Sequence, residues 1–154
     1  MSKDKEFKHI TMYDIPEQSP GFLLWHISTS WRSSIEAVLK PLCLTHPQFV
    51  VLATVGWLTR NGERVSQATI GKMAGLDPNT TSQIIRGLEV KKLIKRLPST
   101  DVRAKNPLLT PKGSQALVKA LPAVEVADAQ FFKALAAQEL ELMINLFQKL
   151  TVKL

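Results

Sequence analysis

A short interruption between two helical patterns constrains the fold of this chain more than any other feature. Gly75 ends the first pattern, and Asp77 followed by Pro78 is a typical start for the second. The first pattern begins at Ser66, another residue type that caps helices. Two short helices joined by a tight turn containing glycine form a helix-turn-helix, which the sequence therefore predicts. The inward stripe of the second helix consists of Ile84, Ile85 and Leu88.

The outward face of the second helix carries side chains suited to reading DNA bases. Asn79, Gln83 and Arg86 follow one another at intervals of four and three residues, so they share one face. Asn and Gln pair with adenine and Arg with guanine in the major groove, while the first turn offers backbone amides to a phosphate. The same pattern also fits a polar helix face that only meets solvent.

A hairpin with a basic loop is expected directly after this helix. Residues 93–97 and 107–109 read as short strands on either side of the loop PSTDVRAKN. Arg103 and Lys105 alternate along one arm, so they point to the same side, toward a minor groove or phosphates. Asp101 is interpreted as the partner that holds the Arg103 guanidinium in position. The alternative is a loose surface loop.

The positive charge of the chain is concentrated in the same region. The net charge is +7, and residues 60–112 hold eleven Lys and Arg against four Asp and Glu, whereas bases and acids elsewhere cancel. Such a patch is typical of modules that bind polyanions, although a charged face also serves solubility. The residues expected to contact DNA are Ser66, Gln67, Pro78, Asn79, Thr80, Ser82, Gln83, Arg86, Arg96, Arg103 and Lys105.

Amphipathic helices are expected on either side of this unit. Between residues 22 and 40 an apolar residue recurs at every fourth position, and Pro41 ends the pattern. The next helix starts near Thr45 and is apolar nearly all round, which predicts that it is buried. A further helix starts at Thr110, and Pro122 is expected to kink or split it.

The last helix carries an apolar seam with alternating spacings of three and four residues, which is typical of helices that pack at a shallow angle. We interpret the seam as a dimer interface, although packing within one chain would give the same pattern. Its members are Leu140, Met143, Phe147 and Leu150.

The predicted fold is mainly α (α+β), a winged helix-turn-helix with further helices on its N- and C-terminal sides. Its expected parts are an N-terminal arm over 1–20, a helical region over 21–45 and 111–154, and the winged helix-turn-helix DNA-binding unit over 46–110.

Composition narrows the remaining classes. No apolar run approaches the roughly 18 residues of a membrane span, and the charged N-terminus lacks the apolar core of a signal peptide. We therefore expect a cytoplasmic protein without membrane contact. Cys43 is the single cysteine, which excludes an internal disulfide. Because the sequence has no nucleophile elbow, phosphate loop, carboxylate pair or metal-ligand set, we expect neither an enzyme nor a cofactor.

Aromatic and histidine side chains gather in the first two expected helices. They form a candidate pocket for an aromatic or anionic ligand, with Arg32 as a further polar contact; the alternative is that they pack in the core or at a dimer interface. Cys43 also has two interpretations, a redox-sensing thiol and a packed, inert cysteine. The candidate pocket residues are Trp25, His26, Trp31, His46, Phe49 and Trp57.

Several separated motifs agree in order and spacing with one known family. The stretch VSQATIGKMAGLDPNTTSQIIRGLEVKKLIKRLPSTDVRAKNPLLTPKG is similar to the winged helix-turn-helix core of the MarR family of bacterial transcriptional regulators. Within it, DVRAKNPLLTPKG resembles the family's D-x-R-A-K…LT-x-x-G wing pattern. Upstream, LTHPQFVVL resembles the L-T-x-x-Q-x-x-x-L stretch, and the order of elements agrees from about residue 22 onward.

The resemblance implies a homodimer with N- and C-terminal dimerisation helices, which would make 21–45 and 111–154 the helical dimerisation region. These helices of the two subunits would interlock, and each subunit would place one winged helix on a pseudo-palindromic operator in double-stranded DNA. It assigns the recognition helix to residues 77–89 and the wing arginine to Arg103. Many members are repressors released by small phenolic or other aromatic ligands, or by thiol oxidation. The ligand cleft would be lined by the first two helices and the start of the fifth.

We therefore expect a sequence-specific DNA-binding transcriptional regulator, a dimeric repressor of MarR type released by a small aromatic ligand. The alternative is a winged-helix protein-interaction module without sequence-specific DNA binding.

Two positions depart from the family pattern. Lys92 stands where members often carry glycine after the recognition helix, and a left-handed conformation there costs a non-glycine residue about 1 kcal/mol. The turn is therefore expected to be looser or built differently. Pro107 stands at a strand position without an amide hydrogen for a ladder bond, so it is expected at a sheet edge.

Overall fold

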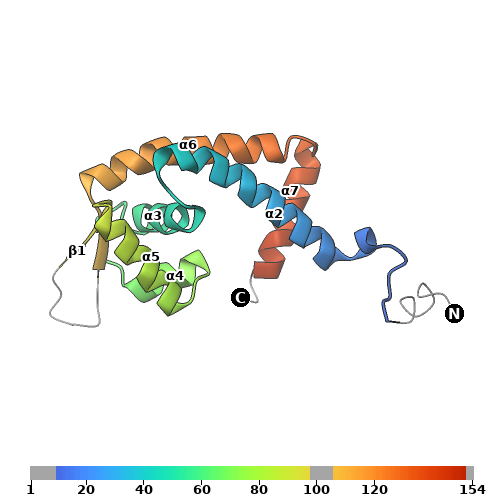
Figure 1. The fold of residues 1–154 in the computed structure, drawn as a ribbon, viewed down its shortest axis with the longest axis horizontal. Helices are drawn as coiled ribbons and strands as arrows, with labels where there is room; N and C mark the ends of the chain where they lie inside the picture. The colour runs from blue at the N-terminus through green and yellow to red at the C-terminus, as the bar shows by residue number, and fades with distance from the viewer. Residues whose placement is uncertain (1–9, 98–105, 152–154) are drawn as a thin grey trace.

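The computed structural model describes residues 10–97 and 106–151, and its elements follow the order that the sequence predicts (Figure 1). The elements are η1 (Pro16–Gln18), α2 (Pro20–Leu39), η2 (Lys40–Leu42), α3 (His46–Leu58), α4 (Gln67–Ala74), α5 (Pro78–Val90), β1 (Ile94–Leu97), β2 (Asn106–Leu109), α6 (Pro111–Phe131) and α7 (Ala137–Thr151). The mainly α fold with one small hairpin is confirmed. Among these elements no single helix is long and apolar enough to cross a membrane.

The molecule consists of a compact lobe and a pair of long helices that extend away from it. The lobe contains α3, α4, α5 and the hairpin, while α2 and α6 run from it toward α7 and the N-terminal segment (Figure 1). α2 and α6 pack along one another, so the arms and the lobe share one framework. The N-terminal segment is not wholly extended, because η1 forms one turn before α2.

Side-chain caps fix the helix starts where the sequence places them. Thr45 and Gln48 form a reciprocal capping box at the start of α3, each side chain bonding the other's backbone amide. Thr110 accepts a hydrogen bond from the Gly113 amide at the start of α6, and Asp77 caps α5 in the same way. The boundaries were therefore predictable from local chemistry.

α3 forms the centre of the core, as its all-round apolar sequence predicts. It packs against α2, α4, α5, α6 and β2. The fully or nearly fully buried apolar residues around it are Ile35, Leu39, Leu44, Phe49, Val51, Leu52, Val55, Ile70, Ile85, Leu88, Leu93, Ile94, Ala120 and Val124. This core holds the two short helices α4 and α5 in a fixed relation to the long arms.

α6 continues through Pro122 without a break, so the split that the sequence allowed does not occur. The proline removes one helical hydrogen bond and is exposed. Ala120 and Val124 on either side of it are buried, and the packing of α6 along α2 keeps both halves in one helix.

Candidate nucleic-acid interface

The turn between α4 and α5 is built as the sequence predicts. Gly75 adopts a left-handed conformation with φ of 67°, and the Leu76 amide donates 2.9 Å to the Gly71 carbonyl, which ends α4. Gly71 also allows the two helices to cross closely, because a Cβ there would lie 2.6 Å from Thr81 Oγ1. The crossing fixes the angle at which α5 is presented.

The start of α5 presents a carboxylate to its surroundings. The Thr80 amide donates 2.9 Å to Asp77 Oδ1, and the Thr80 hydroxyl bonds the other carboxylate oxygen. These hydrogen bonds hold the pKa of Asp77 below its ordinary value. Since Pro78 has no amide hydrogen and the Thr80 amide is occupied, the first turn offers a phosphate less than the sequence suggested.

The two faces of α5 separate as expected. Thr81, Ile85 and Leu88 are buried at intervals of four and three residues, and half-buried Ile84 packs against the same core. The sequence prediction of the inward stripe did not include Thr81. Asn79, Gln83 and Arg86 are exposed on the opposite side, together with Pro78, while Thr80 and Ser82 are half-buried. Ser66 and Gln67 lie half-buried at the start of α4.

The hairpin forms, but its tip lies outside the described residues. β1 and β2 pair antiparallel from Ile94 opposite Leu109 to Leu97 opposite Asn106. The expected roles of Asp101, Arg103 and Lys105 fall in the segment 98–105 and stay predictions.

Arg96 is held by a partner within the chain. Its Nε lies 2.7 Å from Glu89 Oε1, and the side chains are 20% and 30% exposed. Because this ion pair joins the last turn of α5 to β1, it fixes the hairpin against the helix. Sequence reasoning placed Arg96 on DNA and did not foresee this partner.

The turn after α5 is regular, so the expectation of a looser turn is wrong. Lys92 is left-handed with φ of 59°, the Leu93 amide donates 2.9 Å to the Leu88 carbonyl, and the Lys92 amide donates 2.8 Å to the Glu89 carbonyl. This is the Schellman arrangement with lysine in the glycine position. Pro107 lies opposite Arg96 in a two-stranded sheet, where every residue is at an edge, as expected.

The start of α6 is joined to the end of the turn after α5. The Thr110 hydroxyl donates 2.6 Å to the Lys92 carbonyl and accepts from the Gly113 amide at 3.0 Å. A Cβ on Gly113 would lie 1.9 Å from the Leu93 carbonyl oxygen, so only glycine fits. The LT-x-x-G spacing therefore records one cap and one close backbone approach.

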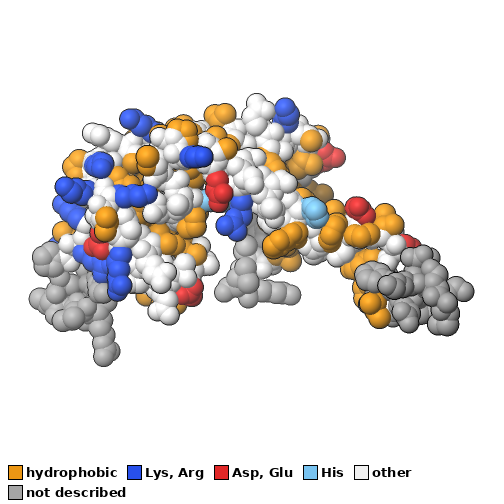
Figure 2. Space-filling model, in the orientation of Figure 1, with side chains coloured by type: hydrophobic (Ala, Val, Ile, Leu, Met, Phe, Trp, Pro, Cys, Tyr) orange, Lys and Arg blue, Asp and Glu red, His pale blue; other side chains and the backbone are white. Residues whose placement is uncertain are grey.

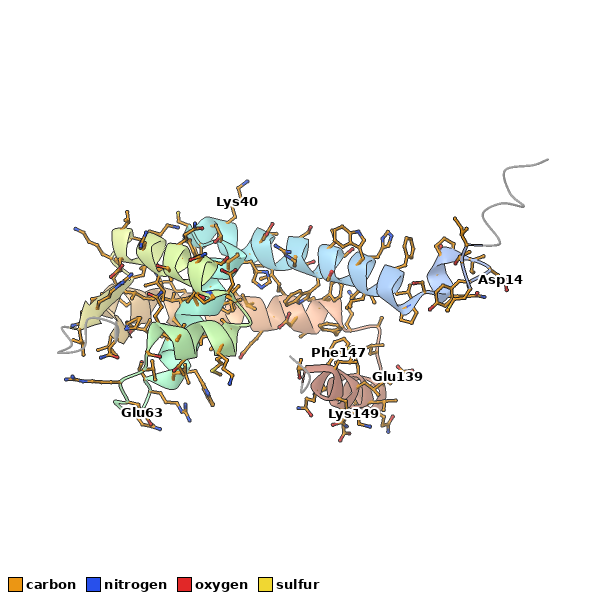
Figure 3. All side chains as sticks on the ribbon, turned by 90° about the horizontal axis from the view of Figure 1, so that it is seen from below. Asp14, Lys40, Glu63, Glu139, Phe147 and Lys149 are labelled. Carbon is orange, nitrogen blue, oxygen red and sulfur yellow. The ribbon has the colours of Figure 1, made fainter. Side chains whose placement is uncertain are left out.

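A second candidate region is a cavity of about 700 Å3 between α2, the end of α6 and α7. Its wall is mostly apolar, and in Figure 3 Phe147 lies on the side of α7 that faces α2 and α6, with Lys149 on the opposite side. The lining residues are Leu24, Ile27, Ser28, Trp31, Asp128, Ala129, Phe132, Lys133, Leu135, Leu140, Met143, Ile144 and Phe147.

The six candidate pocket residues are not brought together there. Trp31 alone lines the cavity, whereas His46 and Phe49 are buried in the core behind it. Trp25 is 70% exposed, His26 stacks on Phe22, and Trp57 lies under the Arg60 guanidinium at the far end of α3. The helices carry these side chains on different faces, so nearness in sequence did not make one site.

Trp31 connects this cavity to the lobe. Its indole Nε1 donates 2.7 Å to Asp128 Oδ1, and its ring lies edge-on to His46 with centroids 5.0 Å apart. Burial lowers the pKa of His46, Arg32 lowers it further, and Glu36 and Asp128 act in the opposite direction. Sequence reasoning missed Asp128, although a carboxylate four residues after buried Val124 was a usable signal.

Cys43 is exposed, so its interpretation as a packed residue is wrong. It ends η2 in a left-handed conformation with φ of 55°. Among the residues that the structure describes, no group of three or more His, Cys, Asp or Glu could hold a metal ion.

A helix-turn-helix closed by a β-hairpin, with a polar face on its second helix, defines a winged helix-turn-helix protein. The model of the MarR family matches residues 44–104. YdcH of Bacillus subtilis strain 168, described as an uncharacterized HTH-type transcriptional regulator, is 35% identical over 125 residues, covering 80% of this chain and 85% of that protein. The chain belongs to the MarR family of transcriptional regulators.

Solved structures agree with the fold. A MarR family protein of Mycobacterium tuberculosis solved in complex with DNA is 26% identical, with a TM-score of 0.66 over 86% of this chain and 97% of that one. The same protein solved with salicylic acid is 27% identical, with a TM-score of 0.64 over 86% and 96%. CouR of Rhodococcus jostii RHA1, solved with p-coumaroyl-CoA, has a TM-score of 0.78 and 23% identity over 90% and 95%.

Proposed function

We propose that this protein is a dimeric repressor that binds a pseudo-palindromic DNA site and is released by a small aromatic ligand. One observation carries the DNA-binding part: Asn79, Gln83 and Arg86 are exposed together on α5, a helix whose other face is fixed in the core. These are the side chains that pair with base edges in the major groove. The Mycobacterium tuberculosis relative that was solved with DNA supports the same role for this chain.

The proposal assigns different roles to the basic side chains. Arg86 reads bases, and Arg103 with Lys105 contacts the flanking groove or phosphates. Arg96 holds the hairpin through Glu89 in place of a direct DNA contact. Asp101 orients Arg103.

Binding of DNA is tested by selecting duplexes from a random pool and measuring anisotropy of the selected sequence across a salt series. An enriched inverted repeat, with log K falling steeply as salt rises, is expected for a dimer. Arg86→Ala should weaken the selected site roughly 10- to 100-fold and relax one base position, whereas Lys149→Ala on α7 serves as a charge-matched control. If no sequence is enriched, a protein-interaction module becomes the better account.

The cavity between α2, α6 and α7 is the candidate ligand site. Its size suits a small organic molecule, and among the described lining residues Lys133 and Asp128 are the ionisable groups in a mostly apolar wall. An aromatic anion fits this lining, with its ring against apolar side chains and its charge toward Lys133. The relative solved with salicylic acid supports this class of ligand.

Ligand release is tested with salicylate added to the complex of protein and selected DNA. Salicylate is expected to release the DNA, and Lys133→Gln should weaken this release. The DNA affinity of the variant without salicylate should be unchanged. A reporter gene behind the selected site should be repressed by the protein and derepressed by the ligand. Activation of the reporter would contradict the repressor part of the proposal alone.

A further inference from the structure

A separate cavity of about 530 Å3 lies where η2, the end of α5 and the start of α6 meet. Of the residues that the structure describes, none lines both this cavity and the one between α2, α6 and α7. Its Lys91 wall is about 20 Å along the α5 axis from Asp77, where the helix begins. The cavity is therefore distinct from both the candidate ligand site and the first turn of the recognition helix.

Among the described residues that line this cavity, the charged side chains are Lys91, Lys112 and Lys119, and none is Asp or Glu. Figure 2 shows Lys and Arg side chains gathered at the end of the molecule where α5 stops and α6 starts. Since the described part of the wall contains three lysines and no acid, it would attract an anion inside the cavity from three sides.

Two of the ammonium groups are held in place by the protein itself. Lys91 Nζ donates 2.6 Å to the Cys43 carbonyl and 2.7 Å to Gln48 Oε1, and Lys112 Nζ donates 3.1 Å to the Lys91 carbonyl. An ammonium has three N–H donors, so the contacts within the described part of the chain use two of them on Lys91 and one on Lys112. Because both side chains are already positioned, binding an anion costs less side-chain entropy.

The rest of the wall is apolar and comes from elements that the core fixes. Pro41 and Leu42 of η2, Leu93 after α5, and Ala116 of α6 line it. On α6, residues 112, 115, 116 and 119 are spaced as one helical stripe, so a single face supplies two lysines, an amide and a methyl group. The cavity thus combines a cationic wall with an apolar one.

We propose that this cavity binds a small organic anion whose phosphate or carboxylate meets the three lysines and whose apolar part lies on Leu42, Leu93 and Ala116. None of the described residues that line it belongs to the proposed DNA surface or to the cavity between α2, α6 and α7. An occupant would touch both ends of the segment that carries the hairpin, since Lys91 and Leu93 precede β1 and Lys112 follows β2.

Cys43 gives a direct reporter, because it is the single cysteine, is exposed and lines the cavity. The rate at which iodoacetamide alkylates Cys43 in the full chain is measured by mass spectrometry with four probes: phenyl phosphate, benzoate, inorganic phosphate and phenol. Phenyl phosphate or benzoate is expected to slow alkylation at least about 5-fold at millimolar concentration. Phenol, which lacks the charge, and inorganic phosphate, which lacks the apolar part, should protect more weakly.

Variants separate the site from general anion binding. Lys119→Gln should weaken protection several-fold, and Lys112→Gln combined with it should abolish protection. Lys149→Gln on α7 removes the same charge elsewhere and should leave protection unchanged. Circular dichroism and thermal unfolding establish that each variant is folded. If the double variant does not fold, the loss of protection in Lys119→Gln alone is the test.

Four results would overturn the proposal. One is the absence of protection by either organic anion at about 10 mM. Another is equal protection by phenol, which would indicate apolar binding alone. The third is protection by the organic anions that persists when Lys112 and Lys119 are both replaced. Equal protection by duplex DNA at the same concentration of charge would also overturn it, because that result would indicate a nucleic-acid surface.

Discussion

His46 is the residue whose surroundings make the stability of the protein depend on pH. It is buried, contacts the Trp31 ring, and has a pKa lowered chiefly by burial and then by Arg32. The folded protein therefore binds a proton at this site less readily than the unfolded chain. Protonation acts on the contact between α2 and α3, where the long arms meet the lobe.

The stability that neutral His46 contributes should be fully present above pH 6.5, the ordinary pKa of histidine. It should be lost as the pH falls from 6.5 toward the lowered pKa of His46 in the folded protein. His46→Gln should flatten this dependence, because glutamine does not titrate. His26→Gln, a change at an exposed histidine, should leave it intact. Urea unfolding at about pH 7.5 and about pH 5.5 measures the difference. The same pH dependence in both variants would contradict the role of His46.

Gly113 is the residue at which one methyl group should matter most. Gly113→Ala places a Cβ against the Leu93 carbonyl and is expected to destabilise the protein by about 3 kcal/mol. Gly21→Ala is the matched control, since its Cβ would meet only Ser19 Oγ at 3.9 Å, and it should stabilise by about 0.5 kcal/mol. Denaturant titration measures the unfolding free energies of both variants. Equal effects of Gly113→Ala and Gly21→Ala would contradict the close approach of Gly113 to the Leu93 carbonyl.

The contacts of a single residue could be predicted from the sequence where its partner is a near neighbour along the chain. They could not be predicted where folding brings the partner close from a distant segment. The caps at Thr45, Asp77 and Thr110 follow from residues three positions away, so they were predicted. The partner of Arg96 and the crowding at Gly113 depend on chain segments brought together only by folding. No sequence spacing signals either contact.

At the scale of elements, the turn that follows α5 retains a lysine in a conformation that favours glycine. Lys92→Gly should relieve this backbone cost and raise stability by about 1 kcal/mol. Lys95→Gly, in β1, should lower stability by roughly 1 kcal/mol, because a strand position gains nothing from glycine. Thermal unfolding of both variants beside the parent chain is the measurement, and a destabilised Lys92→Gly protein would refute the assignment of strain.

Element order and type were predictable, while the assembly of elements into a cavity was not. Periodicity and caps gave the helices and the hairpin, because both signals are local. The expected cleft joined the first two helices and the start of the fifth, whereas the observed cavity is lined by α2, the far end of α6 and α7. The cavity lies there because α6 continues as one helix to Phe131, whereas Pro122 in the sequence suggested that the helix would kink or split.

At the scale of the whole molecule, α7 and the start of α2 leave large apolar side chains exposed. Phe147 is 44% exposed, Leu150 66% and Leu24 57%, and no α7 residue is buried among those described. A contiguous apolar surface of this kind is typical of an obligate interface. It supports the proposed homodimer through Leu140, Met143, Phe147 and Leu150, the first three of which also line the cavity between α2, α6 and α7.

Phe147→Glu should weaken dimerisation roughly 100-fold, because the interface would then bury a charge without a partner. Lys149→Glu adds an acid on the opposite side of the same helix and should leave the dimer intact. Sedimentation equilibrium measures both, and affinity for an inverted repeat should fall with the dimer. An unchanged association constant for Phe147→Glu would remove α7 from the interface.

The hydrogen bond between Leu93 and Thr110 separates the hairpin from the rest of the lobe, so that the hairpin can be changed without altering the lobe. The Thr110 amide donates 3.0 Å to the Leu93 carbonyl, so the chain leaves and re-enters the lobe at one point. Substitutions, insertions or deletions between Leu97 and Asn106 therefore need not move α5 or α6. Groove preference can therefore be engineered in this segment while the arms and the lobe keep their geometry.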